Sequence, residues 1–88
     1  MKYPTISFGE LEIGDVFRIP HSYLFDPSDF VKTEMIKDGF FLVNSMNKKT
    51  GIRFYLSSHT PVVIEKDFSL LDDAVAEYQK SDSAPMDT

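Results

Sequence analysis

The stretch that decides the fold is Phe30–Ile64, FVKTEMIKDGFFLVNSMNKKTGIRFYLSSHTPVVI. It contains four runs rich in β-branched and aromatic residues, which are typical of strands. The dipeptide Asp38-Gly39 predicts a two-residue type I′ hairpin loop after the first run. A second turn, Asn47–Gly51, follows the second run, because glycine readily adopts the left-handed conformation that closes such a loop. We therefore expect three consecutive antiparallel strands, a crossing and a final strand.

These turns set the bounds of the predicted strands. Pro20 ends an earlier strand, because proline cannot donate a hydrogen bond to the sheet. The phenylalanines Phe17, Phe30, Phe40 and Phe54 are predicted to form the core. Alternation places Ile52, Phe54 and Leu56 inside the sheet, and Arg53 and Tyr55 outside. The predicted strands are Val16–Ile19, Phe30–Lys37, Phe40–Met46, Ile52–Leu56 and Val62–Glu65.

Five short strands, with a long loop after the first and a brief crossing before the last, predict a mainly β fold. We expect a small five-stranded SH3-like barrel with a C-terminal helix. An OB-type barrel also has five strands. Its helix lies between strands three and four, however, and nothing helical separates Asn47 from Ile52.

The segment Ser69–Tyr78 has the pattern of a helix. Ser69 suits the N-cap, and acidic residues in the first turn favour the positive end of the helix dipole. Leu71, Val75 and Tyr78 fall on one face, so the helix can cover an open end of the barrel. We expect one domain over residues 1–80, with the capping helix at 69–80 and a flexible acidic tail at 81–88.

Composition narrows the class of protein. A chain of 88 residues fits one domain, and 8 Phe and 4 Tyr supply a dense core. The absence of cysteine excludes disulfides and thiolate chemistry and fits a reducing compartment. No apolar run reaches the ~20 residues of a membrane span, and the first residues lack the apolar segment of a secretory signal. We therefore expect a cytoplasmic protein.

The net charge of −5 is unevenly distributed, with most of the acidity in residues 67–88 and an excess of basic residues in 29–66. An acidic chain is a poor match for non-specific nucleic-acid binding, which needs lysine and arginine against phosphate. The mildly basic sheet keeps a local contact with nucleic acid open.

Three short segments carry a resemblance to a known group of proteins. They are Phe8-Gly9-Glu10-Leu11-Glu12-Ile13-Gly14-Asp15-Val16-Phe17, Val31-Lys32-Thr33 and His59-Thr60-Pro61-Val62. The chain resembles small uncharacterised proteins of bacteriophages and bacteria with F-x-x-L-x-x-G-D-x-F, K-T and T-P-V segments. The resemblance implies a small β-barrel of phage or bacterial origin and no established activity. Those relatives usually carry Asp where this chain has His59, so a role of that acid is not transferred.

The sequence contains no pattern that predicts catalysis or a metal site. Ser57 or Ser58 beside His59 lacks the third group and the oxyanion site that a nucleophile needs. His21 with Asp26 and Asp29 has no recognised ligand spacing, and polar loop residues explain it better. Nucleotide-binding and metalloprotease motifs are absent from the sequence. We predict a non-enzymatic protein without cofactor or metal.

Two sets of residues are candidates for binding a partner. Tyr23, Leu24 and Phe25 in the long loop, with Tyr55 and His59 opposite, would line a groove for an extended peptide. The alternative is that the loop residues fold down and plug the barrel. Lys48, Lys49 and Arg53, together with Tyr55, would form a basic and aromatic surface for nucleic acid. Here the alternative is that charged hairpin residues keep the sheet soluble.

From these patterns we predict an interaction module, of phage or accessory origin, that binds a host or viral protein. A nucleic-acid-binding barrel is the second hypothesis.

Overall fold

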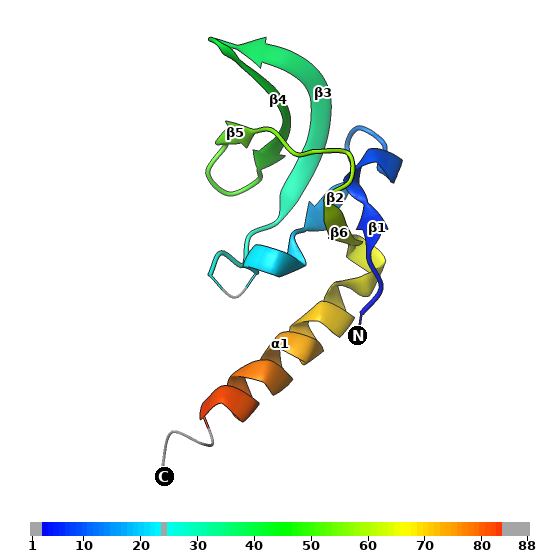
Figure 1. The fold of residues 1–88 in the computed structure, drawn as a ribbon, viewed down its shortest axis with the longest axis vertical. Coiled ribbons are helices and arrows are strands. Elements are labelled where there is room, and N and C mark those ends of the chain that lie inside the picture. The colour runs from blue at the N-terminus through cyan, green and yellow to red at the C-terminus, as the bar shows by residue number, and fades with distance from the viewer. Residues whose placement is uncertain (1–2, 24, 84–88) are drawn as a thin grey trace.

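The computed structural model describes residues 3–23 and 25–83, and within them six strands form one antiparallel sheet that does not close (Figure 1). The strand order is β1-β6-β2-β3-β4-β5. The strands are β1 (Ile6–Ser7), β2 (Val16–Arg18), β3 (Phe30–Asp38), β4 (Phe41–Asn47), β5 (Arg53–Phe54) and β6 (Pro61–Ile64). The helices are α1 (Phe68–Ser83) and three 3₁₀ turns, η1 (Phe8–Glu10), η2 (Pro20–Ser22) and η3 (Glu65–Asp67).

The mainly β class with a C-terminal helix is confirmed, but the sheet differs from the predicted closed barrel of five strands. The N-terminal arm supplies an additional strand, β1, which pairs with β6 through Ile6 and Val62. At the other end, β5 has only two residues. The backbone of Leu56 bonds the side chain of Asn44 instead of continuing the ladder, with N–O distances of 2.9 Å in both directions. The strand β5 therefore ends early, and the sheet stays open at that edge.

The core lies inside the curve of this sheet and is built around a row of aromatic rings. Phe8 contacts Phe17 edge to face, with ring centroids 5.3 Å apart, and Phe17 lies 5.7 Å from Phe30. Phe30 then meets Phe54 edge to face at 5.2 Å. Such pairs add about 0.5–1.5 kcal/mol each beyond their buried area. The buried core residues are Phe8, Leu11, Phe17, Phe30 and Val62.

The segment that precedes β2 is fastened to the middle of the sheet by Lys32. The Lys32 ammonium donates to the carbonyl oxygen of Leu11 at 2.6 Å and lies 4.8 Å from the centre of the Phe8 ring. The Gly14 amide donates to the Lys32 carbonyl at 2.8 Å, and Gly14 has a φ of +96°. Lys32 thus holds the segment before β2 against the sheet.

The β3–β4 hairpin extends away from the rest of the sheet (Figure 1). Lys32 is paired with Ser45, but the next pair is Ile36 with Val43, so three residues of β3 face one residue of β4. A bulge of this kind bends a hairpin and increases its twist. Beyond the bulge, among the described residues, the two strands pair only with each other.

The turn of this hairpin lies one residue later than predicted. Asp38 pairs with Phe41, so the two loop residues are Gly39 and Phe40. Gly39 has a φ of +66°, whereas Phe40 does not have a positive φ, which excludes the predicted type I′ loop. The shift moves Phe40 from the predicted core to the tip of the hairpin, where it is 96% exposed.

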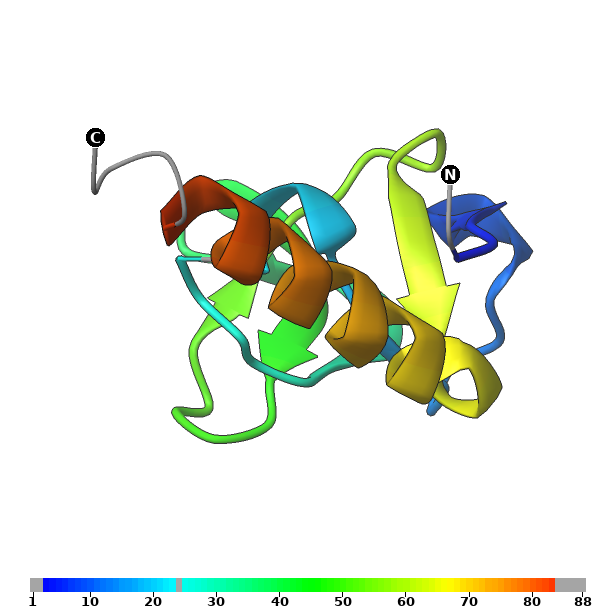
Figure 2. The ribbon, with the colours of Figure 1, turned by 90° about the horizontal axis from the view of Figure 1, so that it is seen from below.

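The C-terminal helix begins earlier and ends later than predicted. The turn η3 leads directly into α1 at Phe68, so Ser69 lies inside the helix and is not its N-cap. Leu71 is buried, and α1 starts beside β6 and extends away from the sheet, at the end of the molecule opposite the hairpin tip (Figure 1, Figure 2). The helix continues to Ser83, within the predicted tail, and residues 84–88 lie outside the described residues. None of the described helices has the length and apolar character of a membrane span.

Candidate functional site

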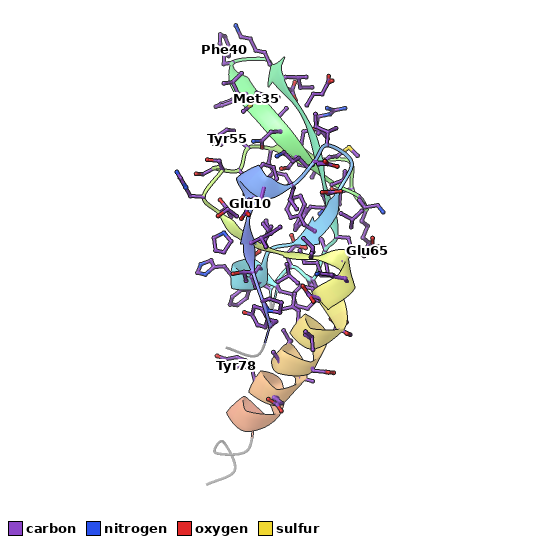
Figure 3. All side chains as sticks on the ribbon, turned by 90° about the vertical axis from the view of Figure 1, so that its right-hand side faces the viewer. Glu10, Met35, Phe40, Tyr55, Glu65 and Tyr78 are labelled. Carbon is purple, nitrogen blue, oxygen red and sulfur yellow. The ribbon has the colours of Figure 1, made fainter. Side chains whose placement is uncertain are left out.

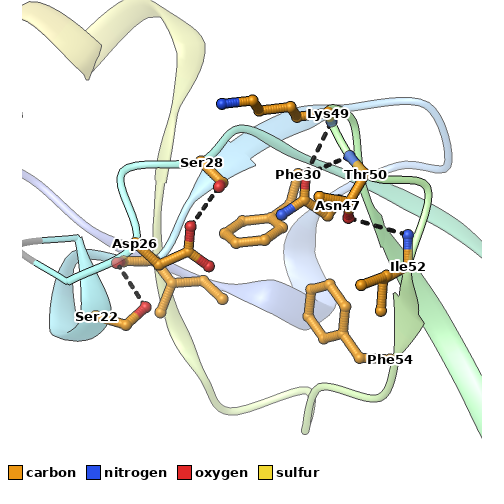
Figure 4. A pocket seen from close by; sticks show the side chains of 10 residues that line it. Ser22, Asp26, Ser28, Phe30, Asn47, Lys49, Thr50, Ile52 and Phe54 are labelled. Atoms are coloured by element: carbon orange, nitrogen blue, oxygen red, sulfur yellow. Dashed lines mark hydrogen bonds between the residues drawn. The ribbon is translucent and has the colours of Figure 1, made fainter.

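A pocket of about 530 Å³ opens at the end of the aromatic row, between the loop before β3 and the turn after β4 (Figure 4). We call it the end pocket. Its floor consists of Phe30 and Phe54, the last two rings of the row, with Ile19 beside them. Ile52, which was predicted to point into the core, instead forms the rim and is 65% exposed. Phe30 is buried, whereas Phe54 and Ile19 are partly exposed, so the pocket reaches only the edge of the apolar core.

One wall of the end pocket is the turn that follows β4. The Asn47 side-chain oxygen accepts the backbone N–H groups of Lys49 at 2.8 Å and Thr50 at 3.1 Å. The Thr50 hydroxyl accepts the N–H of Ile52 at 3.2 Å. Asparagine and threonine are common in turns because their side chains make such bonds. The wall therefore keeps its shape without a ligand.

The opposite wall is the loop that links η2 to β3. The Ser22 carbonyl accepts the N–H groups of Phe25 at 3.0 Å and Asp26 at 2.9 Å. The Ser28 hydroxyl donates to the Asp26 carboxylate. The two polar walls and the apolar floor have the composition of a preformed ligand site.

A second hollow of about 440 Å³ adjoins the end pocket and shares Asp26, Ser28 and Lys49 with it. The Lys48 N–H donates to the Asp29 carbonyl at 3.0 Å, so the turn and the loop are joined at this point. Across the described residues, no ion pair occupies the side chain of either Lys48 or Lys49. These two lysines form a cationic rim at one side of the end pocket.

Arg18 also lines the second hollow, but its charge is already matched. Its Nε lies 2.7 Å from Asp29 Oδ1, and one terminal nitrogen lies 3.0 Å from Asp72 Oδ1 of α1. Its guanidinium carbon is 4.1 Å from the centre of the Phe68 ring. Burial alone lowers the pKa of Arg18, but the bond to Asp29 and the nearby carboxylates outweigh it, so this pKa lies above its ordinary value. Arg18 therefore anchors α1 to the sheet.

The structure does not gather the predicted peptide-groove residues in one place. Tyr23 donates its hydroxyl to Asp72 at 2.6 Å, and burial together with this bond raises the pKa of Tyr23. Phe25 is 88% exposed. Tyr55 lines two hollows beside the hairpin, and His59 lies exposed in a turn between β5 and β6. Leu24 lies outside the described residues.

The predicted basic and aromatic surface is likewise divided. Lys48 and Lys49 lie at the second hollow, whereas Arg53 and Tyr55 line a hollow beside β4. The Ser57 hydroxyl accepts the backbone N–H of His59 at 3.2 Å, so it serves the turn. Over the ranges 3–23 and 25–83, no group of three acidic or histidine side chains is placed to hold a metal ion.

Among the described residues, Lys49 is the one residue lining the end pocket that was predicted to bind a partner; the others were predicted as turn, loop, strand or core residues. One signal would have located this pocket: Phe30 at the start of β3 pairs with Asn47 at the end of β4. The loop before one residue and the turn after the other must then lie side by side, because paired residues are about 5 Å apart. The predicted hairpin already implied this juxtaposition.

Comparison of the chain with protein-family models, with curated proteins and with solved structures found no match. The function proposed below therefore follows from the geometry of the site.

Proposed function

We propose that the protein is a non-enzymatic interaction module that binds an extended segment of a partner protein in the end pocket. The observation that carries this proposal is the aromatic floor, in which partly exposed Phe54 lies beside buried Phe30, between two walls held by their own hydrogen bonds. A preformed apolar pocket with a few polar groups at its edge is the usual form of a binding site. A rigid site of this kind loses little conformational entropy when a ligand binds.

The chemistry of the pocket specifies the segment it takes. The floor accommodates one aliphatic or aromatic side chain, and the serine, asparagine and threonine side chains of the walls suit a peptide backbone. Lys48 and Lys49 lie beside it without carboxylate partners in the described chain. A segment with an apolar residue followed or preceded closely by Asp or Glu complements both features.

The arrangement also supports an SH3-like classification, which we include in the proposal. In such domains, a long loop after the first strand and a turn between later strands flank the groove for extended peptides. Here the loop between β2 and β3 and the turn between β4 and β5 have these positions. Given the phage-like motifs, we propose a cytoplasmic accessory protein of phage or bacterial origin whose partner is a host or viral protein.

The test is selection from a ribosome-displayed library of random peptides with the whole chain as bait. We expect enrichment of peptides with an apolar residue next to an acidic one. The Ile52→Asp variant should lose binding by about a hundredfold, because it places a charge at the rim of an apolar pocket. Lys49→Glu should lose about tenfold at low salt and less at high salt, since salt screens exposed charges.

The matched control is Ile13→Asp, which makes the same change at an exposed isoleucine outside the end pocket. This variant should bind the selected peptides as the wild type does. Equal enrichment with wild-type and Ile52→Asp bait would contradict the proposal. Single-stranded DNA at low salt is the probe for the nucleic-acid alternative, and saturable binding that is lost in Lys48→Glu would favour it.

A further inference from the structure

The distal hairpin carries apolar surface that no other part of the described chain covers. Phe40 and Phe41 are 96% and 74% exposed, and Leu42 beside them is also exposed. Figure 3 shows Phe40 at the end farthest from α1, with Met35 and Tyr55 nearer the body. Three consecutive exposed apolar residues are unusual in a monomeric protein and mark an interaction site.

The same residues lie on an open strand edge. β5 pairs with β4 at Ser45 and Met46, so among residues 3–23 and 25–83 no strand pairs with the outer edge of β4 from Phe41 to Val43. Exposed edges are normally protected by charged residues, proline or bulges. Residues 40–46 contain neither a charge nor a proline. The part of β3 from residue 33 to 38, in contrast, carries the bulge and three charged residues, Glu34, Lys37 and Asp38, so the β4 edge is the one suited to pairing.

A hollow of about 290 Å³ lies directly beside this edge. Phe41, Leu42 and Val43 form one side, and Phe54 and Tyr55 form another. Asp38 and Arg53 also line it, one from the turn end of the hairpin and one from β5. The hairpin therefore presents a projecting ring, Phe40, close to an apolar hollow that holds one charge of each sign.

We infer that this surface is the interface of a symmetric dimer in which the β4 edges of two copies pair antiparallel. A pairing centred on Leu42 places Phe41 of one copy opposite Val43 of the other, and Phe40 opposite Asn44. Phe40 of each copy then reaches the hollow beside Tyr55 of the other. The turn that carries Asp38 approaches Arg53, so opposite charges meet twice across the twofold axis.

The available area fits a second copy. Phe40, Phe41 and Tyr55 together present roughly 350–550 Å² of aromatic surface per copy. This is about half of the ~800 Å² per partner in a standard interface, before Leu42, Arg53 and the strand edges are counted. A symmetric interface uses each ring and each hollow twice, so a single hairpin supplies both halves of the contact.

Sedimentation velocity of the whole chain tests this inference. We expect a dimer whose dissociation constant rises at least tenfold in Phe40→Ser, a change at the hairpin tip that leaves the monomer fold intact. Asp38→Arg and Arg53→Asp should each weaken the dimer roughly tenfold. The double variant Asp38→Arg/Arg53→Asp should restore it to within about threefold, because the opposite charges again face each other across the axis.

A wild-type chain that stays monomeric at about 1 mM would overturn the inference, as would a double variant no stronger than the single ones. Binding of a monomeric wild type to phosphatidylglycerol vesicles would overturn it in favour of a membrane surface. Of the described residues, the hollow beside β4 shares only Phe54 with the end pocket, and the tests use other residues: Ile52→Asp should dimerise normally, and Phe40→Ser should still bind the selected peptides. Failure of one proposal therefore leaves the other standing.

Discussion

Both ends of the β3–β4 hairpin carry phenylalanine, but in opposite environments. At the base, Phe30 and Ser45 are buried between β2 and β5. At the tip, Phe40 and Phe41 face solvent, although they belong to the apolar run Phe40–Val43. The difference is that β2 and β5 flank the base, whereas beyond the bulge the described strands pair only with each other. Apolar residues at the base therefore stabilise the fold, and those at the tip are available for contact with another molecule.

The test with the largest expected effect replaces one phenylalanine at each end of the β3–β4 hairpin. Phe30→Ala should destabilise the protein by about 3–5 kcal/mol, because it removes a buried ring that contacts Phe17 and Phe54. Phe40→Ala should cost less than about 0.5 kcal/mol in the monomer. Urea unfolding at low micromolar concentration measures both. Similar losses at the two positions would show that Phe40 is packed within the monomer.

The sequence predicted the base of the sheet well and the tip poorly, for a physical reason. The positions of the five predicted strands and the turn after Asn47 follow from local propensity and glycine chemistry, and the structure confirms the strand ends to within two residues. The position of the turn between β3 and β4, in contrast, can shift by one residue along the chain. Asp-Gly and Gly-Phe both suit a two-residue loop, and choosing the first moved Phe40 into the predicted core.

The other differences between the predicted and the observed structure arise from contacts between residues that are distant in the sequence. The early end of β5 depends on the Asn44 side chain, which takes the place of a backbone partner for Leu56. The binding residues were predicted from residue type in one loop, whereas the end pocket arises from two segments that meet only through the Phe30–Asn47 pairing. Sequence periodicity shows which face of a strand is buried, but not which side chains replace backbone partners.

Asn44 lies where the base of the hairpin meets the tip, and it offers the second test. Asn44→Ala should cost about 1–3 kcal/mol, because it leaves both the N–H and the carbonyl of Leu56 without partners. The Leu56 amide should also exchange its hydrogen faster. Asn47→Ala, the same change in the exposed turn, is the control and should cost less. Unchanged Leu56 exchange in Asn44→Ala would contradict the role given to this side chain.

The third test compares two lysines of β3, Lys32 and Lys37, and the expected loss of stability is smaller. Lys32→Met should destabilise by about 1–2 kcal/mol, since the carbonyls of Leu11 and Phe8 lose a charged donor. Lys37→Met, on the exposed distal part of the same strand, should change stability by no more than about 0.5 kcal/mol. Thermal unfolding compares the two variants. Equal shifts in Tm would mean that the hydrogen bonds of Lys32 do not help to hold residues 8–15 against the sheet.

The smallest predicted effect concerns the opposite end of the molecule, where Tyr23 and Arg18 hold α1. The pKa of Tyr23 is raised in the folded protein by burial and by its bond to Asp72. Because this pKa is raised, Tyr23 contributes its full stabilisation below the pKa of tyrosine in the unfolded chain, about 10. The stabilisation is lost as the pH rises through the pKa of Tyr23 in the folded protein. Ionised Tyr23 would place a second negative charge against Asp72. The stability difference between wild type and Tyr23→Phe, about 1 kcal/mol at pH 8, should therefore shrink above about pH 10. A Tyr23→Phe difference that stays constant from pH 8 to 11 would contradict the prediction.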